Sequence, residues 1–115
     1  MEKSYWEFLD KKKHLNWNAI SNKDRINTIS ELTTVINNYG FIIDFKFYSD
    51  LAVALSIEIE EQKIQELFSE LSHFLTMDKD YNYRSKLSRE RIILLNVTFA
   101  KSTGKQTNEI PSVPG

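Results

Sequence analysis

Hydrophobic and polar residues alternate most regularly between residues 40 and 61. Nine apolar residues occupy odd-numbered positions in two groups: Phe41, Ile43, Phe45 and Phe47, then Leu51, Val53, Leu55, Ile57 and Ile59. A period of two over this length predicts two β-strands that each bury one face. We therefore expect the phenylalanine row to face the core.

The length of the loop between these strands decides whether both apolar rows share a face. A two-residue loop would place them on opposite faces, whereas an odd-length loop, Tyr48-Ser49-Asp50, places them together. We predict the odd-length loop, with three cross-strand pairs: Phe47 with Leu51, Phe45 with Val53, and Ile43 with Leu55.

Residues 21–39 predict a helix because apolar residues recur every three or four positions. Ser21 is the expected N-cap, with Asp24 three residues later, and Gly40 is expected at the left-handed position after the helix. The predicted apolar stripe of this helix consists of six residues, one of them a threonine: Ile26, Ile29, Leu32, Thr33, Val35 and Ile36.

Residues 61–76 predict a second helix. Glu60 and Glu61 are expected to stabilise its positive N-terminal end. Its expected buried side is made of Ile64, Leu67, Phe68, Leu71, Phe74 and Leu75.

The remaining segments predict one more strand and several open alternatives. Residues 92–100 form the last strand, with Ile93, Leu95, Val97 and Phe99 facing the core. Residues 76–91 have weak periodicity and predict either a mobile functional loop or a short helix. The segment HLNWNAI forms a further strand, unless residues 3–13 form a helix and only three strands exist.

The order of elements predicts an α+β domain, a two-layer sandwich with helices on one face of a small antiparallel sheet. With the additional strand the layout is ferredoxin-like, a fold that hosts many functions. We expect an N-terminal arm over residues 1–20, either helix or edge strand, a single domain over 21–100, and a flexible tail over 101–115.

Composition removes several classes of chemistry. The net charge is −1. The chain has no cysteine, and this absence excludes disulfides, thiolate nucleophiles and thiolate metal sites. The N-terminal sequence lacks the apolar run of a signal peptide, so we expect a cytoplasmic protein. Abundant Lys, Asn and Ile indicate an AT-rich genome and hence a bacterium.

Three motifs that suggest catalysis or metal binding fail on inspection. The segment from Asp78 has Tyr83 and Arg89 where a calcium loop needs Gly and Glu. KSTGKQ lacks the earlier glycine of a phosphate loop. His73 lies near Glu66 and Glu70 but lacks further convergent ligands. We therefore expect no catalytic constellation, metal site or cofactor, and favour a protein that is not an enzyme.

The face of the hairpin opposite the phenylalanine row, here called the reverse face, is the first candidate binding surface. It is more apolar than a solvated face requires, and its alanines leave room for another layer. The expected binding residues are Ile42, Asp44, Lys46, Tyr48, Ala52 and Ala54. Three occupants are open: the N-terminal arm with Tyr5, Trp6, Phe8 and Leu9, a second copy of the chain, or a partner protein or small ligand.

A second candidate surface is a basic patch before the last strand, formed by Arg84, Lys86, Arg89 and Arg91. Cations beside Tyr81 and Tyr83 are the residue types that bind single-stranded nucleic acid. The balanced net charge argues against a dedicated nucleic-acid binder. The favoured function is thus an interaction domain that binds a protein partner or itself; the alternatives are a small-ligand regulatory domain and an RNA-binding accessory protein.

Overall fold

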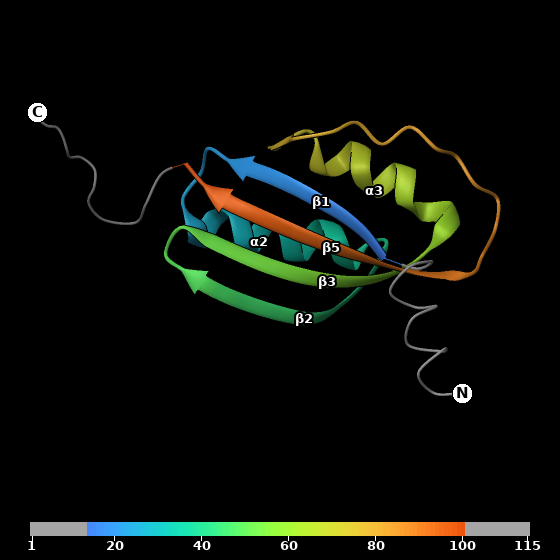
Figure 1. Ribbon diagram of the computed structural model, residues 1–115, viewed down its shortest axis with the longest axis horizontal. Helices are drawn as coiled ribbons and strands as arrows, with labels where there is room; N and C mark the ends of the chain where they lie inside the picture. Colours follow the sequence, from blue (N-terminus) through green and yellow to red (C-terminus); the bar gives the residue numbers. More distant parts are fainter. Residues whose placement is uncertain (1–13, 101–115) are drawn as a thin grey trace, which may run out of the picture.

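Five strands form one mixed sheet, and two α-helices lie together on one side of it (Figure 1). The structure, a computed structural model, describes residues 14–100. The strand order is β2-β3-β5-β1-β4, with every neighbouring pair antiparallel except β1 and β5. The predicted α+β class is confirmed. A purely antiparallel, ferredoxin-like sheet is not confirmed, because β1 runs parallel to β5.

The strand predicted at HLNWNAI is β1, His14–Ser21. It lies inside the sheet, between β5 (Glu90–Phe99) and the three-residue strand β4 (Leu75–Met77). Trp17 and Ala19 are buried while Asn16 and Asn18 are exposed, so the middle of the strand places polar residues on the reverse face, followed by the half-exposed Ile20. Residues 1–13 of the expected N-terminal arm and the expected tail lie outside the described residues.

Helix α2 (Arg25–Asn37) is shorter at both ends than predicted. Its N-cap is Asp24, whose Oδ1 accepts a 2.8 Å hydrogen bond from the backbone N–H of Asn27. Ser21 is the last residue of β1 instead, and its buried Oγ lies 2.6 Å from Oγ1 of Thr28. The C-cap residue Asn38 is right-handed, and Gly40 is the first residue of β2 with no left-handed backbone, so the role expected for Gly40 is wrong.

The hairpin consists of β2 (Gly40–Ser49) and β3 (Ala52–Glu60). Phe47 pairs with Val53 and Phe45 with Leu55, two residues away from the predicted register. The predicted parity holds for these two phenylalanines, but two bulges, between Ile42 and Asp44 and between Phe47 and Ser49, shift the register. Only Asp50 and Leu51 separate the strands, and Leu51 is half exposed.

The first bulge overturns the predicted orientation at the start of β2. Ile42 lies opposite buried Ile57 and packs against the core, although it was expected on the reverse face. Phe41 lies opposite Glu58, and 69% of its surface is exposed. Ile43 is also exposed, so neither residue takes the predicted core position.

The second helix begins with a 3₁₀ turn, η2 (Glu61–Lys63), and continues as α3 (Ile64–Leu71). Ile64, Leu67, Phe68 and Leu71 are buried as predicted. The helix ends five residues earlier than expected, because the chain turns there and Leu75 enters β4. Residues 78–89 have no regular structure and run alongside α3 (Figure 1).

The core lies between the sheet and the two helices. The predicted inward row of β5 is buried, as are the inward residues of β3. An aromatic cluster closes the β1 side, with the Trp17 ring 5.2 Å from Phe68 and 5.7 Å from Tyr81. No helix within residues 14–100 is long and apolar enough to cross a membrane.

Candidate protein-interaction edge

Strand β2 is one of the two edge strands of the sheet, and its apolar side chains are largely exposed. Among the described residues only β3 pairs with it, so the backbone along its outer side has no strand partner. None of its ten residues is buried. More than half of the surface is exposed for Phe41, Ile43, Phe47 and Tyr48. An edge with this composition is a template for pairing with another chain.

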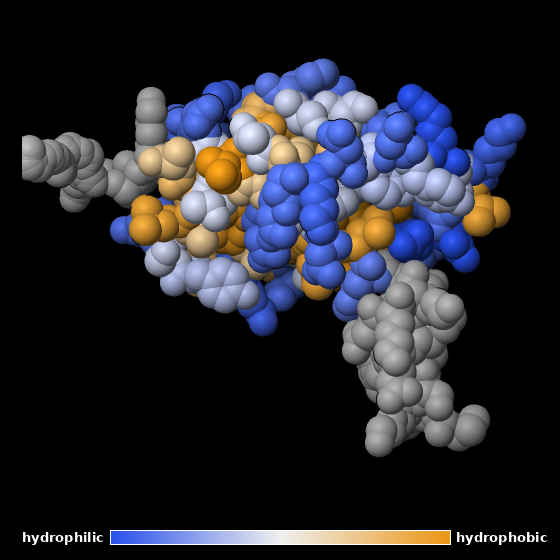
Figure 2. Space-filling model, turned by 45° about the horizontal axis from the view of Figure 1, so that its top comes forward, coloured by the Kyte–Doolittle hydropathy of each residue, from blue (hydrophilic) through white to orange (hydrophobic). Residues whose placement is uncertain are grey.

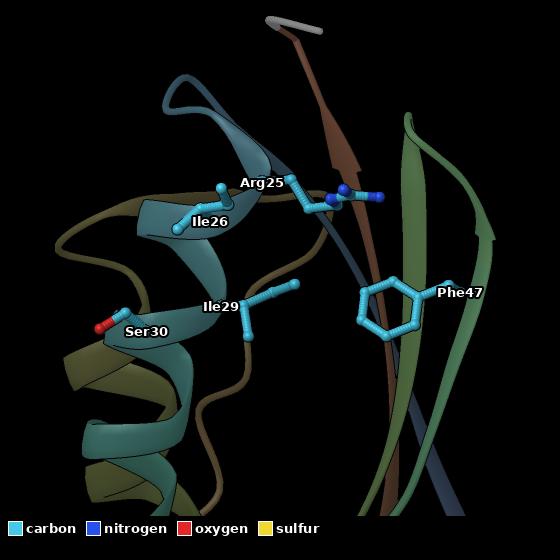
Figure 3. Close-up of a pocket in the computed structure, with 5 residues that line it drawn as sticks. All are labelled: Arg25, Ile26, Ile29, Ser30 and Phe47. Carbon is cyan, nitrogen blue, oxygen red and sulfur yellow. The ribbon is translucent and has the colours of Figure 1, made fainter. Parts of the chain in front are cut away.

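A shallow apolar groove lies beside this edge, on the helix side of the sheet. Its volume is about 490 Å³, and it is lined by Arg25, Ile26, Ile29 and Ser30 of α2 and by Phe47 of β2. Figure 3 shows the Phe47 ring directed towards Ile29 across the groove. Ile26, expected in the core, is 69% exposed, because the residues that α2 buries are Thr28, Leu32 and Ile36.

Arg25 fixes the upper end of the groove. Its Nη1 donates a 3.0 Å hydrogen bond to Oδ1 of Asp50 in the β2–β3 turn. Its guanidinium carbon also lies 5.7 Å from the centroid of the Phe47 ring, within the range of a cation–π contact. The first turn of α2 is therefore tied to the tip of the hairpin, which keeps the Phe47 ring in place although it is exposed.

The reverse face receives most of the residues that the sequence assigned to it. Asp44 and Lys46 pair with Ser56 and Ala54, and these positions alternate with the inward-facing Phe45 and Leu55. Ala52 and Ala54 are half buried, and Tyr48 lies exposed at the second bulge. Of the six predicted binding residues, the structure separates Ile42 from the others by turning it towards the helices.

A polar band crosses the middle of the reverse face. Lys46, Ala54, Asn96 and Asn18 occupy successive strands in register, and Nδ2 of Asn96 donates a 3.2 Å hydrogen bond to Oδ1 of Asn18. Seen obliquely, the hydrophobic surface is broken into patches by hydrophilic side chains (Figure 2). The reverse face is thus not one continuous apolar surface.

The predicted basic patch is divided by a buried carboxylate. Glu61 in η2 has a fully buried side chain, and its Oε1 accepts hydrogen bonds from Nε of Arg89 at 2.7 Å and Nη1 of Arg91 at 2.8 Å. Oε2 accepts a 2.6 Å hydrogen bond from Oγ of Ser85. Arg84 and Lys86 remain exposed, so two of the four cations neutralise Glu61.

Three hydrogen bonds stabilise the charged form of Glu61. The bonds from Ser85, Arg89 and Arg91, with Ser85 contributing most, lower the pKa of Glu61 from 4.5 to about 2 although burial opposes the shift. Two backbone hydrogen bonds of 2.9 Å also join η2 to the 78–89 segment. The N–H of Glu61 donates to the carbonyl oxygen of Arg89, and the N–H of Gln62 donates to that of Leu87. This constellation fixes the end of the 78–89 segment rather than forming a cleft.

A second hollow of about 390 Å³ lies between α3 and the start of the 78–89 segment. It is lined by Gln65, Phe68, Ser69, Ser72, His73, Asp80, Tyr81 and Asn82. The Oε1 atom of Gln65 is buried and is the one buried side-chain oxygen or nitrogen in residues 14–100 without a hydrogen-bond partner. Burial is the main cause that raises the pKa of Tyr81 here. Within the same residues no three His, Cys, Asp or Glu side chains converge as metal ligands.

Sequence reasoning missed the exposed edge and groove because it assigned Phe41, Ile43 and Ile26 to the core. A signal was present at the edge: Phe41, Ile42 and Ile43 are three consecutive apolar residues, which fit either parity of a strand. No comparable signal marks the groove, whose two walls come from separate elements. No family model, curated protein or solved structure matches this chain.

Proposed function

We propose that this chain is a protein-interaction domain that binds a partner strand along β2, with the groove beside Phe47 receiving a side chain of that partner. The observation that carries this proposal is the ten-residue edge strand on which four large apolar or aromatic side chains are more than half exposed. Strand addition combines backbone hydrogen bonds for affinity with alternate side-chain pockets for specificity.

The geometry supplies both parts of this recognition mode. The outer backbone of β2 has no strand partner among the described residues, and the groove opens beside the same strand. Arg25 contacts Phe47 at the groove wall and pairs with Asp50, two contacts that restrict this anchor before binding. An ordered aromatic anchor reduces the entropy lost on association.

Site-specific photocrosslinking in cells tests this proposal. With Tyr48→p-benzoylphenylalanine we expect one discrete protein adduct, identified by peptide mass spectrometry. The same probe at Tyr83, which is similarly exposed on the 78–89 segment, serves as the control and should give none. Adding Ile43→Lys to the Tyr48 probe should remove the adduct. If the Tyr48 probe forms no adduct, or if Ile43→Lys leaves it intact, β2 is not the binding edge.

A second candidate function, binding of a small polar ligand, is favoured by the unpartnered Gln65 Oε1 at the hollow beside α3. A ligand with a hydrogen-bond donor would satisfy this buried acceptor, and His73 and Asp80 offer further polar contacts. Thermal shift against a metabolite panel tests it, since a ligand at about a hundred times its dissociation constant adds roughly 2.7 kcal/mol. RNA binding has less support, because Arg89 and Arg91 both pair with Glu61, whose charge offsets one of the two cations.

A further inference from the structure

The two bulges leave only a short part of β2 with a regular ladder. From Asp44 to Phe47 each residue pairs in sequence with β3, and side chains alternate between the reverse face and the helix side. A second strand added to the outer side of β2 can follow this stretch but not the bulges, which bend and twist the strand. The regular pairing with a partner strand is therefore confined to this stretch.

Asp44 and Lys46 give this stretch opposite charges on one face. Both side chains are exposed and lie on the reverse face, opposite Ser56 and Ala54. In an antiparallel pair, side chains directly across from each other share a face, and opposite charges there stabilise the pair. A strand that presents Lys opposite Asp44 and Asp opposite Lys46 is the charge-complementary partner, and β2 of a second copy has both residues.

A two-fold axis between the two strands can pass through any one of the four residues of this stretch. Centres at Asp44 and at Lys46 place like charges opposite each other, Asp44 on Asp44 and Lys46 on Lys46. A centre at Phe47 places Lys46 opposite Tyr48 of the second copy, so no pair between Asp44 and Lys46 forms. A centre at Phe45 places each Asp44 opposite Lys46 of the second copy, so both ion pairs form.

We infer that two copies of this chain associate by antiparallel pairing of their β2 strands about a two-fold axis at Phe45, with Asp44 of each copy opposite Lys46 of the other. This rests on the proposed function, because it names the occupant of the proposed binding edge. The two sheets then join into one, and the strand of the second copy continues the sheet beside the groove at Phe47. Each apolar edge is covered by its equivalent, which removes the open edge.

Charge variants and sedimentation velocity test this arrangement. We expect the full chain to be a dimer at low micromolar concentration. Asp44→Lys makes both positions basic and Lys46→Asp makes both acidic, so each converts two attractive pairs into repulsive ones. We expect the dissociation constant of each variant to rise at least about tenfold. Glu66→Lys on α3 and Lys79→Asp after β4 are exposed matched controls and should remain dimeric.

Mixing gives the sharpest result. An equimolar mixture of Asp44→Lys and Lys46→Asp should form a heterodimer, and the double variant Asp44→Lys/Lys46→Asp should dimerise again. Because the chain has no cysteine, Asp44→Cys mixed with Lys46→Cys offers a second readout. The mixture should form an intermolecular disulfide faster than either variant alone.

A parent chain that stays monomeric at about 100 µM would overturn the inference, as would a dimer indifferent to both single charge variants or a mixture that does not associate. These failures differ from failure of the proposed function. A Tyr48 photoadduct with a different protein keeps β2 as a binding edge while excluding the second copy as its occupant.

Discussion

The Nε atom of Arg89 lies 2.7 Å from Oε1 of Glu61, a carboxylate whose side chain is fully buried. Arg91 and Ser85 complete the hydrogen bonds to this carboxylate. Twenty-eight positions separate Glu61 from Arg89, so the contact joins the start of the second helix to the end of the irregular 78–89 segment. It fixes the entry to β5, which pairs with both β3 and β1.

Removing this carboxylate should destabilise the domain. Glu61→Ala removes the buried acceptor that Arg89 and Arg91 share, and breaking a buried pair in this way costs about 3–5 kcal/mol. Urea unfolding at neutral pH measures the change. Glu66→Ala, on an exposed position of α3, should stay within about 0.5 kcal/mol of the parent. A loss below about 1 kcal/mol for Glu61→Ala would show that the pair contributes little net stability.

The same carboxylate should make stability depend on pH. Its pKa is about 2 in the folded protein and 4.5 in the absence of these contacts, so the folded state favours the charged form. Its contribution, about 3 kcal/mol, is fully present above pH 4.5 and is lost as the pH falls towards 2. Urea unfolding of the parent and Glu61→Gln across this range measures it. The difference between the two proteins should shrink with acid, and a constant difference would contradict the assignment.

The sequence predicted the class of fold because its apolar periodicities are local. The inward rows of β3 and β5 and the buried residues of α3 follow directly from a period of two or of about 3.6. The bulges in β2 could not be predicted in the same way. Phe41-Ile42-Ile43 fits either alternation, and the choice is made by packing of Ile42 against the core, a tertiary contact.

The residues of the candidate edge could be predicted only in part. Asp44, Lys46, Ala52 and Ala54 were placed on the reverse face correctly, because the alternation from Asp44 to Phe47 is regular. That β2 is an edge strand follows from the strand order, which a local sequence pattern does not contain. Glu61 shows the same limit: its sequence position suggested a helix-dipole contact, while its hydrogen-bond partners lie far along the chain.

The N-cap of α2 gives a second stability prediction. Asp24→Ala removes the acceptor for the backbone N–H of Asn27 and should cost about 1 kcal/mol. Asn22→Ala, two residues earlier and exposed, should have little effect. Thermal unfolding of both variants measures the difference. Equal melting temperatures for Asp24→Ala and the parent would contradict the cap.

At Ser21 the structure and the sequence-based expectation predict different effects for the same substitution. As an N-cap it would be replaceable by Asp, which caps equally well. In the structure its hydroxyl is buried against Thr28 at 2.6 Å, and Ser21→Asp would bury a carboxylate at the end of β1. We expect Ser21→Asp to destabilise the domain by about 2 kcal/mol or more in urea unfolding. Asp at the exposed neighbouring position, Asn22→Asp, is the control and should leave stability within about 0.5 kcal/mol of the parent.

Gly40 is required by close approach of two strands rather than by a left-handed turn. A Cβ atom at this position would lie 2.4 Å from the backbone carbonyl oxygen of Glu58 and 3.1 Å from Cβ of Ile59. Because the nearest atom belongs to the backbone of β3, β2 must move away from β3 to accept any side chain at this open end of the hairpin. We expect Gly40→Ala to cost about 1–3 kcal/mol in urea unfolding, although alanine replacing glycine at an unstrained site is stabilising. Thr98→Ala, exposed on β5, should change little. A stabilised Gly40→Ala would mean that the strands can separate here without loss.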